Sequence, residues 1–257
     1  MVDCNKLSTI IIYMERDINV EVIVLDDPQL KVKPIKIEER PETGINTAFP
    51  DHPSLMFISS GTGAGKTSLI QYLLIEPYLK FFNKIFFFCP TLDGAWKKLK
   101  INRDRVFEGY SDEKMRQVIE EIDEDEEQRC LIIVDDCSST NIFRPKNVFS
   151  QFLPNHRHHP SLMGGTSVWV VGHQFHTLQK SLRCLVKDMI VFRIEDADEL
   201  NDIADANRGL MKKKDFMELY EICTDEKYNF MYIKKEGCHR SEMFRKNFDT
   251  IFKITYK

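Results

Sequence analysis

Short apolar runs alternate with longer segments of helical periodicity from residue 54 onward. The apolar runs are almost continuously hydrophobic, which is typical of strands that are buried on both faces. We predict strands at 55–59, 84–89, 130–134, 167–171 and 189–194. We predict helices between or after them, at 66–79, 111–124 and 198–207. This alternation predicts an α/β fold, in which a mainly parallel sheet is flanked by helices on both faces.

The two ends of the chain carry other patterns. Residues 1–53 are expected to form an N-terminal β-rich extension, with strands at 9–13, 19–25 and 31–37 followed by a polar linker at 38–53. Residues 54–257 are expected to form the main domain, of which 195–257 is a C-terminal extension. Within that extension we expect a helix near 214–223 and strands near 228–234 and 250–256. These strands either extend the sheet or form an appendage.

Composition narrows the class of protein. The 257 residues are 42% hydrophobic and 30% charged, which fits a globular chain with one large core and argues against disorder. No apolar run reaches the roughly 20 residues that a membrane helix needs. The N-terminus shows no secretory signal pattern, so we expect neither a membrane partner nor secretion. The seven cysteines form no CxxC pair, which indicates reduced thiols, with no disulfide framework and no cysteine-rich zinc site.

Charge is uneven along the chain. The net charge of −4 does not indicate general nucleic-acid binding. Residues 206–257, however, contain twelve basic side chains against eight acidic ones. A nucleic-acid partner would therefore be contacted through a local basic patch.

The segment 60–68, SGTGAGKTS, carries the clearest chemical signal. It fits the pattern GxxxxGK[ST], except that Ser60 occupies the first glycine position. Glycines let backbone N–H groups approach phosphate oxygens, Lys66 supplies charge to the β- and γ-phosphates, and the Thr67 hydroxyl is suited to ligate Mg²⁺. The following helix directs its positive end at the anion. We therefore predict a P-loop that binds ATP and Mg²⁺ through Gly61, Thr62, Gly63, Ala64, Gly65, Lys66, Thr67 and Ser68.

A second signal is the apolar strand that ends in two carboxylates, CLIIVDD at 130–136. In a P-loop enzyme, Asp135 at the carboxyl end of this strand would hold Mg²⁺ through water. Asp136 would then act as the general base on the attacking water. The two roles remain interchangeable at this point, because side chains alternate in direction along a strand.

Three later polar residues are candidates for catalytic roles. Gln174 follows the strand at 167–171 and is either a sensor of the γ-phosphate or a buried amide bonded to backbone. Arg183 is either an arginine finger acting across a subunit interface or a surface arginine, and Arg157 ranks second for the finger role. The surrounding NHRHH at 155–159 lacks the further ligand a zinc site needs, so we interpret it as a basic loop or a subunit contact.

Together these segments resemble the poxvirus-type genome-packaging ATPases of the FtsK/HerA superfamily, found in large DNA viruses and virophages. The resemblance spans about 54–194 and depends on the P-loop, the strand 84–89 with Pro90-Thr91, LIIVDD at 131–136, NHRHH at 155–159, the strand ending in His173-Gln174, and SLR at 181–183. It implies an additional-strand, RecA-like core. Its implied roles are Lys66 and Thr67 on nucleotide and Mg²⁺, Asp135 on Mg²⁺, Asp136 as base, Gln174 as sensor, and Arg183 or Arg157 as the trans-acting arginine.

The resemblance also implies a function and partners. It implies a homo-oligomeric ring, a pentamer or hexamer, that hydrolyses ATP to translocate double-stranded viral DNA into a preformed capsid, with capsid proteins as partners and the virion or host cytoplasm as location. Two residues depart from the family pattern: Ser60 replaces a glycine, and Asp136 stands where the wider superfamily commonly has glutamate.

The main alternative is a P-loop kinase that transfers the γ-phosphate to a small-molecule acceptor. A kinase has less need of a carboxylate pair for water activation, and it needs an arginine-rich lid. The acidic pair and the strand ending in Gln174 therefore favour hydrolysis over transfer. A GTP-dependent switch ranks lower because the sequence has no Asn-Lys-x-Asp segment. A purely structural nucleotide-binding subunit conflicts with the intact Lys66 and Asp135.

Overall fold

The computed structural model describes residues 43–61, 63–91, 96–137, 142–160 and 165–254, together with the backbone of two N-terminal strands. Contacts divide the chain into two units, Met1–Glu39 and Arg40–Lys257. In the first unit, β1 (Leu7–Tyr13) and β2 (Asn19–Leu25) form an antiparallel pair in which Leu7 lies opposite Leu25. Two of the three strands predicted near the N-terminus are thus confirmed. The third, at 31–37, lies outside the described residues.

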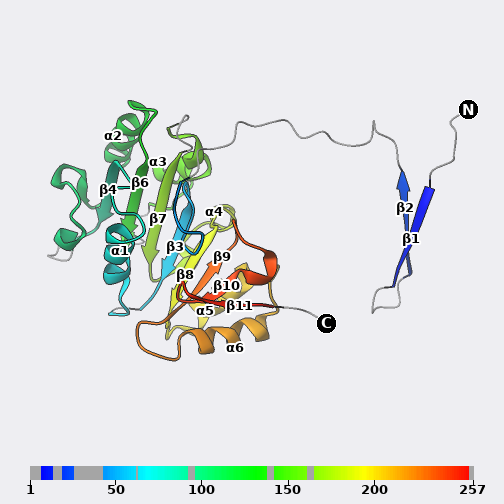
Figure 1. Cartoon of the computed structure of the whole chain (residues 1–257). Helices are drawn as coiled ribbons and strands as arrows, with labels where there is room; N and C mark the ends of the chain where they lie inside the picture. Colours follow the sequence, from blue (N-terminus) through cyan, green and yellow to red (C-terminus); the bar gives the residue numbers. More distant parts are fainter. Residues whose placement is uncertain are drawn as a thin grey trace, which may run out of the picture. The chain divides into compact units, whose positions relative to one another are not determined.

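The second unit is built on a nine-stranded sheet in its described part (Figure 1). The strands lie in the order β11-β10-β9-β8-β3-β7-β6-β4-β5. Their bounds are β3 (Leu55–Ser59), β4 (Lys84–Cys89), β5 (Val106–Glu108), β6 (Cys130–Asp135), β7 (Thr166–Gly172), β8 (Asp188–Phe192), β9 (Phe230–Lys234), β10 (Phe244–Lys246) and β11 (Thr250–Phe252).

Two features of this sheet determine where a site can form. The strands from β8 to β5 are parallel, whereas β9, β10 and β11 continue the sheet antiparallel. The C-terminal strands therefore extend the sheet and do not form an appendage. Strand β7 also lies between β3, which precedes the P-loop, and the acidic strand β6. This inserted strand is the additional strand expected from the resemblance, and the predicted fold class is confirmed.

Helices cover both faces of the sheet (Figure 1). One face packs against α1 (Lys66–Ile75) through Leu69, Ile70, Leu73 and Leu74. The other face is covered by the remaining α-helices, α2 (Asp112–Asp123), α3 (Val148–Phe152), α4 (Lys180–Arg183), α5 (Ala197–Ala206) and α6 (Lys213–Cys223). Because alternate strand residues enter the two layers, strands such as β3 and β7 are buried along their whole length. None of the helices in the described ranges has the length and apolarity that crossing a bilayer requires.

Local chemistry explains where the helices begin and end. The Ser111 hydroxyl accepts from the Lys114 N–H at the start of α2, and Asp196 caps α5 in the same way. Helix α1 ends at Ile75, four residues before the predicted end, because Pro77 disfavours helical backbone at Glu76. The prediction was wrong at that boundary.

Candidate active site

The P-loop connects the end of β3 to the start of α1. Gly63 and Gly65 have φ angles of 75° and 106°, in the left-handed region that favours glycine. A Cβ on Gly65 would also lie 3.2 Å from Cδ1 of Tyr228. Ser60 is buried and has no positive φ, so serine replaces the usual glycine without backbone strain. Thr62, which the sequence also assigns to phosphate contact, lies outside the described residues.

The two acidic residues at the end of β6 point in directions set by a backbone turn. Asp135 is the last residue of the strand and pairs with Val171 of β7. Asp136 follows with a φ of 52°, a left-handed conformation that aspartate tolerates, and its N–H donates to the Val171 carbonyl at 2.9 Å. The turn brings Asp136 Oδ2 to 3.9 Å from Nε2 of His173. Simple strand alternation therefore does not apply to Asp136.

Lys66 links the P-loop to these carboxylates. Its Nζ lies 3.0 Å from Nε2 of His173. Burial lowers the pKa of the Lys66 amine, and the charges of Asp135 and then Asp136 act in the opposite direction. Ser59 pairs with Gly172 and Asp135 pairs with Val171, so the loop and the acidic strand end meet at the same edge of the sheet, on either side of β7.

His173 is a residue that the sequence analysis did not assign to the site. Its Nδ1 contacts the Ser60 carbonyl, which accepts a hydrogen bond, so the proton is placed on Nδ1. Nε2 is then an acceptor for the Lys66 ammonium, and this contact at 3.0 Å outweighs the 3.9 Å approach of Asp136. His173 follows directly after a buried strand that ends in Gly172, and this position alone does not distinguish a site histidine from any other.

Gln174 is not the buried amide that was one of its two predicted roles. It is exposed and precedes a short 3₁₀ turn, where its carbonyl accepts from the N–H and hydroxyl of Thr177. His173, and not Gln174, contacts Lys66. The sensor role of Gln174 stays a prediction.

The two candidate arginines lie away from Lys66. Arg183 belongs to α4, on the sheet face opposite α1, and its guanidinium carbon lies 5.7 Å from the ring centre of Phe175. It lines a cavity of about 530 Å³ with Asp202 and Asp205 of α5. Arg157 is half-buried in a 3₁₀ helix over Leu153–His158 that packs at the amino end of β7, where His156 contacts the Thr166 carbonyl. Neither arginine is brought to the Lys66 site of its own chain.

The buried carboxylate of Glu199 links two segments of the site by hydrogen bonds. Glu199 of α5 is 1% exposed and accepts hydrogen bonds from the Ser59 hydroxyl at 3.1 Å and from the Phe175 N–H at 2.7 and 2.8 Å. Burial raises the pKa of Glu199, and the hydrogen bonds from Phe175 and Ser59 act to lower it. Glu199 thus joins the last residue before the P-loop to the turn after β7. The sequence offered no specific signal for this role.

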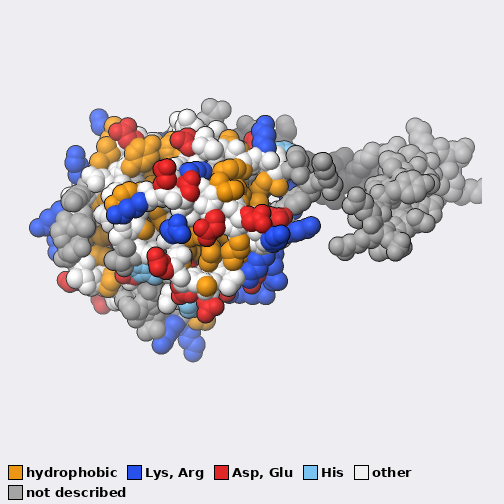
Figure 2. Space-filling model, turned by 90° about the horizontal axis from the view of Figure 1, so that it is seen from below, with side chains coloured by type: hydrophobic (Ala, Val, Ile, Leu, Met, Phe, Trp, Pro, Cys, Tyr) orange, Lys and Arg blue, Asp and Glu red, His pale blue; other side chains and the backbone are white. Residues whose placement is uncertain are grey.

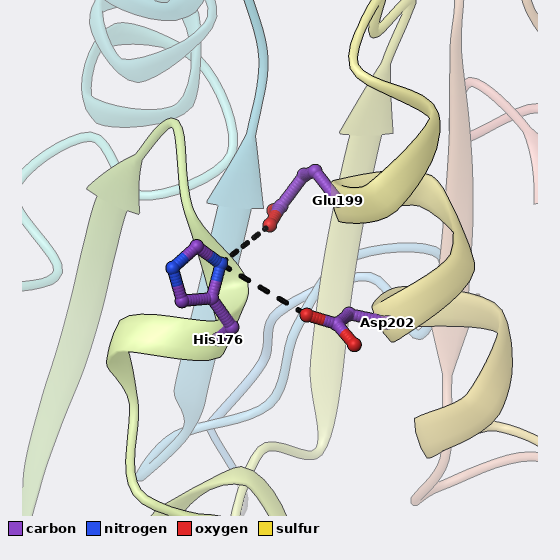
Figure 3. A group of neighbouring side chains, drawn as sticks. All are labelled: His176, Glu199 and Asp202. Carbon is purple, nitrogen blue, oxygen red and sulfur yellow. Dashed lines mark ion pairs between the residues drawn. The ribbon is translucent and has the colours of Figure 1, made fainter.

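His176 and Asp202 lie beside Glu199 (Figure 3). His176 Nδ1 is 3.8 Å from Glu199 Oε2 and 3.9 Å from Asp202 Oδ2. The three side chains have the types that bind metals. Both oxygens of Glu199, however, already accept from the Phe175 N–H. We therefore interpret His176 and Asp202 as polar neighbours of a Glu199 that is already held by the Phe175 N–H and the Ser59 hydroxyl.

The residues at the edge of the sheet fit a magnesium–nucleotide complex. The left-handed Gly65 leaves backbone space that a Cβ would occupy, and the Lys66 charge is available to phosphate. Thr67 and Asp135 offer the hydroxyl and carboxylate oxygens that Mg²⁺ prefers. Their donor chemistry is that of a hard-cation site.

Comparison with known proteins supports the fold. No protein-family model and no curated protein matches the sequence. Among solved structures, the DNA-packaging ATPase B204 from Sulfolobus turreted icosahedral virus is similar over 76% of this chain and 97% of that chain, with a TM-score of 0.57 and 13% identity. The genome-packaging NTPase B204 from Sulfolobus turreted icosahedral virus 2, in complex with ATPγS, matches 77% of this chain and 98% of its own with a TM-score of 0.57 and 12% identity.

A third similar structure is the pCW3 conjugation coupling protein TcpA with ATPγS. It matches 97% of this chain and 67% of its own length, with a TM-score of 0.51 and 9% identity. At these identities the likeness concerns the fold. It confirms the P-loop NTPase fold expected from the sequence.

Proposed function

We propose that this chain is an ATPase motor subunit that uses ATP hydrolysis to translocate double-stranded viral DNA into a preformed capsid. The observation that carries the proposal is the position of Lys66, whose Nζ lies 3.0 Å from Nε2 of His173, the nitrogen that Asp136 Oδ2 approaches to 3.9 Å. The similarity in fold to structures described as DNA-packaging ATPases supports the motor role over other uses of a P-loop.

Each residue of the site has a chemical task in this proposal. Lys66 and the loop backbone bind the phosphates, and Thr67 and Asp135 would hold Mg²⁺. The magnesium ion, when bound, neutralises charge on the phosphate oxygens. Asp136 accepts the proton of the attacking water. His173 is anchored by the Ser60 carbonyl and positions Lys66 through its other ring nitrogen. Gln174 is available to sense the γ-phosphate.

The proposed partners follow from the motor role. Copies of this chain would form a ring, a pentamer or hexamer, around double-stranded DNA, in the virion or the host cytoplasm, and would meet capsid proteins. Arg183, or else Arg157, would reach the nucleotide of a neighbouring copy. Basic, acidic and apolar side chains are interspersed on the face shown in Figure 2. A local group of basic residues is expected to contact the DNA backbone, because the net charge is −4 while residues 206–257 hold twelve basic side chains against eight acidic ones.

The test is ATPase activity of the full chain with and without double-stranded DNA, combined with the mass of the assembly in solution. We expect a multi-subunit particle whose ATPase rate rises with DNA. The effect should weaken steeply as salt increases, because phosphate contacts release counterions. Lys66→Ala is the matched control and should abolish ATP binding. A monomer whose ATP consumption rises only with a small-molecule acceptor would instead support the kinase.

A further inference from the structure

A cavity of about 360 Å³ lies beside the P-loop, on the side away from the catalytic carboxylates. Its lining comes from the residue before α1 and the first two turns of that helix, the last residue of β8, the turn before β9 and the first residue of β9. Besides Gly65, the lining residues are Ser68, Leu69, Tyr72, Phe192, Tyr228 and Phe230. In the sheet, β8 and β9 lie on one side of β3, and β7 and β6 lie on the other. The P-loop therefore stands between this cavity and Asp135.

Two tyrosines give the cavity exposed aromatic surface. Tyr228 is 59% exposed and Tyr72 is 45% exposed, and both are among the five exposed large hydrophobic side chains in the described part of the chain. Behind them, the rings of Phe192 and Phe230 pack with their centres 5.2 Å apart. The cavity thus combines a fixed apolar floor with aromatic rings that face solvent.

The backbone at Tyr228 holds its ring next to the P-loop. Its φ of 74° lies in the left-handed region, which is unfavourable for a bulky residue. Tyr228 Cδ1 lies where a Cβ on Gly65 would meet it at 3.2 Å, so the glycine that begins α1 is also the residue that lets this ring approach. Unfavourable backbone conformations of this kind are found preferentially at ligand sites.

We infer that this cavity receives the base of the bound nucleotide, with the ring of Tyr228 as its stacking partner. The inference rests on the proposed function, in which the P-loop holds the triphosphate. Gly65 belongs to both the loop and the cavity, so a nucleotide whose phosphates lie at Lys66 has an adjoining place for its base. Aromatic rings and an aliphatic side chain supply most of the lining, which suits the flat face of a heterocycle.

The lining also predicts selectivity. A purine presents a larger face than a pyrimidine and should stack more strongly. The lining side chains offer polar atoms only through the Ser68 and tyrosine hydroxyls, whereas strong discrimination between bases needs several buried polar partners. We therefore expect the site to bind adenine and guanine nucleotides with similar affinity.

The experiment measures ATPγS binding to the full chain by titration calorimetry. Tyr228→Asn removes the ring and keeps a residue that tolerates the left-handed backbone. We expect it to weaken ATPγS binding about 5- to 150-fold, the range for loss of one base–aromatic stack. Tyr228→Phe keeps the ring and should stay within about twofold of the parent chain, and GTPγS within about threefold of ATPγS.

Inorganic tripolyphosphate is the matched probe, because it has no base. Its affinity should be the same for the parent chain and for Tyr228→Asn, and should be lost in Lys66→Ala. Unchanged ATPγS affinity in Tyr228→Asn would overturn the inference, and so would an equal loss for tripolyphosphate. A parent chain that binds neither probe would contradict the proposed function itself.

Discussion

The Lys66 amine is positioned by a hydrogen bond to a histidine that is itself bonded to the P-loop. The amine contacts His173, whose other ring nitrogen is anchored to the P-loop carbonyl of Ser60. The neighbouring Asp136 approaches the same histidine from the end of β6. The phosphate-binding lysine and the carboxylate that we assign as base therefore lie next to the same histidine nitrogen, with Lys66 at 3.0 Å and Asp136 at 3.9 Å. Their relative positions are set by three backbone segments that are far apart in sequence.

At the residue scale, Asp136→Asn separates binding from catalysis. Asparagine has the same shape and also tolerates the φ of 52° at this position, but it cannot accept the proton of water. We expect ATP affinity to stay within about threefold and turnover to fall about 10²- to 10⁴-fold, the usual contribution of a general base. Binding is measured with ATPγS and turnover by phosphate release.

A matched control is Asp104→Asn, which changes an exposed carboxylate in a short turn before β5. This variant should keep parental turnover. If Asp136→Asn also keeps parental turnover, another group must activate the water. If Asp136→Asn loses ATP affinity together with turnover, Asp136 contributes to nucleotide binding and not to proton transfer.

At the element scale, the ends of β3 and β7 are tied to one helix. Glu199 of α5 accepts from Ser59 at the end of β3 and from Phe175 in the turn after β7. The same turn carries His173 and Gln174, so α5 helps determine where these residues lie relative to the P-loop. A buried carboxylate in this position is a positioning residue, since it accepts hydrogen bonds from the Ser59 hydroxyl and the Phe175 N–H.

Glu199→Ala should therefore reduce stability and catalysis together. It would leave the Phe175 N–H and the Ser59 hydroxyl buried without an acceptor, at a cost of about 1–3 kcal/mol for each group. We expect a lower melting temperature and a larger loss in kcat than in ATP affinity. Asp202→Ala is the matched control, because Asp202 lies on the same helix beside His176 but its side chain is 42% exposed.

The control variant should stay within about 0.5 kcal/mol of the parent in unfolding free energy, as is usual for surface substitutions. Glu199→Gln is a further check, because its amide can accept through one oxygen only. The melting temperature and kcat of Glu199→Gln should lie between those of the parent chain and those of Glu199→Ala. Equal effects of Glu199→Ala and Asp202→Ala would contradict the buried hydrogen-bonding role.

The sequence predicted those elements that can be recognised from their own apolar pattern, without knowledge of the strand they pair with. The strands at 55–59 and 84–89 have the predicted bounds, because each is a continuous apolar run bordered by polar residues. The strands β5 and β10 are only three residues long, so no period can be read from them. Their positions depend on pairing with β4 and β9, which is a property of the folded sheet.

The same distinction holds for the site: residues in local motifs were predicted, and residues whose roles depend on long-range contacts were not. Lys66 and the aspartates are recognised from local motifs, and the structure places them at one edge as expected. His173 and Glu199 were missed because their roles depend on contacts with Ser60, Ser59 and Phe175 across the fold. A histidine after a strand and a glutamate in a helix have no distinctive local pattern. The pairing of β3 with β7 brings His173 to the P-loop, and the pairing of β3 with β8, which precedes α5, brings Glu199 there.

At the scale of the whole molecule, the carboxyl edge of the sheet holds the proposed nucleotide-binding residues but neither of the two candidate arginines. The proposed base cavity, the P-loop and the acidic strand end follow one another along it, in the order of β8, β3 and β6. The arginine candidates lie elsewhere. Arg183 sits on the face opposite α1, in a cavity that contains no described residue of the P-loop. If Arg183 takes part in hydrolysis, it must act on the nucleotide of another copy.

Complementation between two inactive variants tests this assignment. In Arg183→Ala the P-loop is intact and the arginine is missing, whereas in Lys66→Ala the reverse holds. Each variant alone should have little ATPase activity. In a head-to-tail ring, a site formed by the intact P-loop of one subunit and the intact arginine of its neighbour is complete, so an equal mixture should recover up to about a quarter of the parental activity. ATPase rate is measured across mixing ratios after the subunits have been allowed to exchange.

Arg157→Ala is tested in the same mixtures, because Arg157 is the second candidate and lies at the amino end of β7. Lys180→Ala is the matched control, since Lys180 lines the same cavity as Arg183 and should be dispensable on its own. Recovery with Arg183→Ala requires two chains at each nucleotide site, because every single chain in the mixture carries a defect. Absence of recovery at every ratio, in particles shown by mass to contain both variants, would place the function of Arg183 within its own subunit.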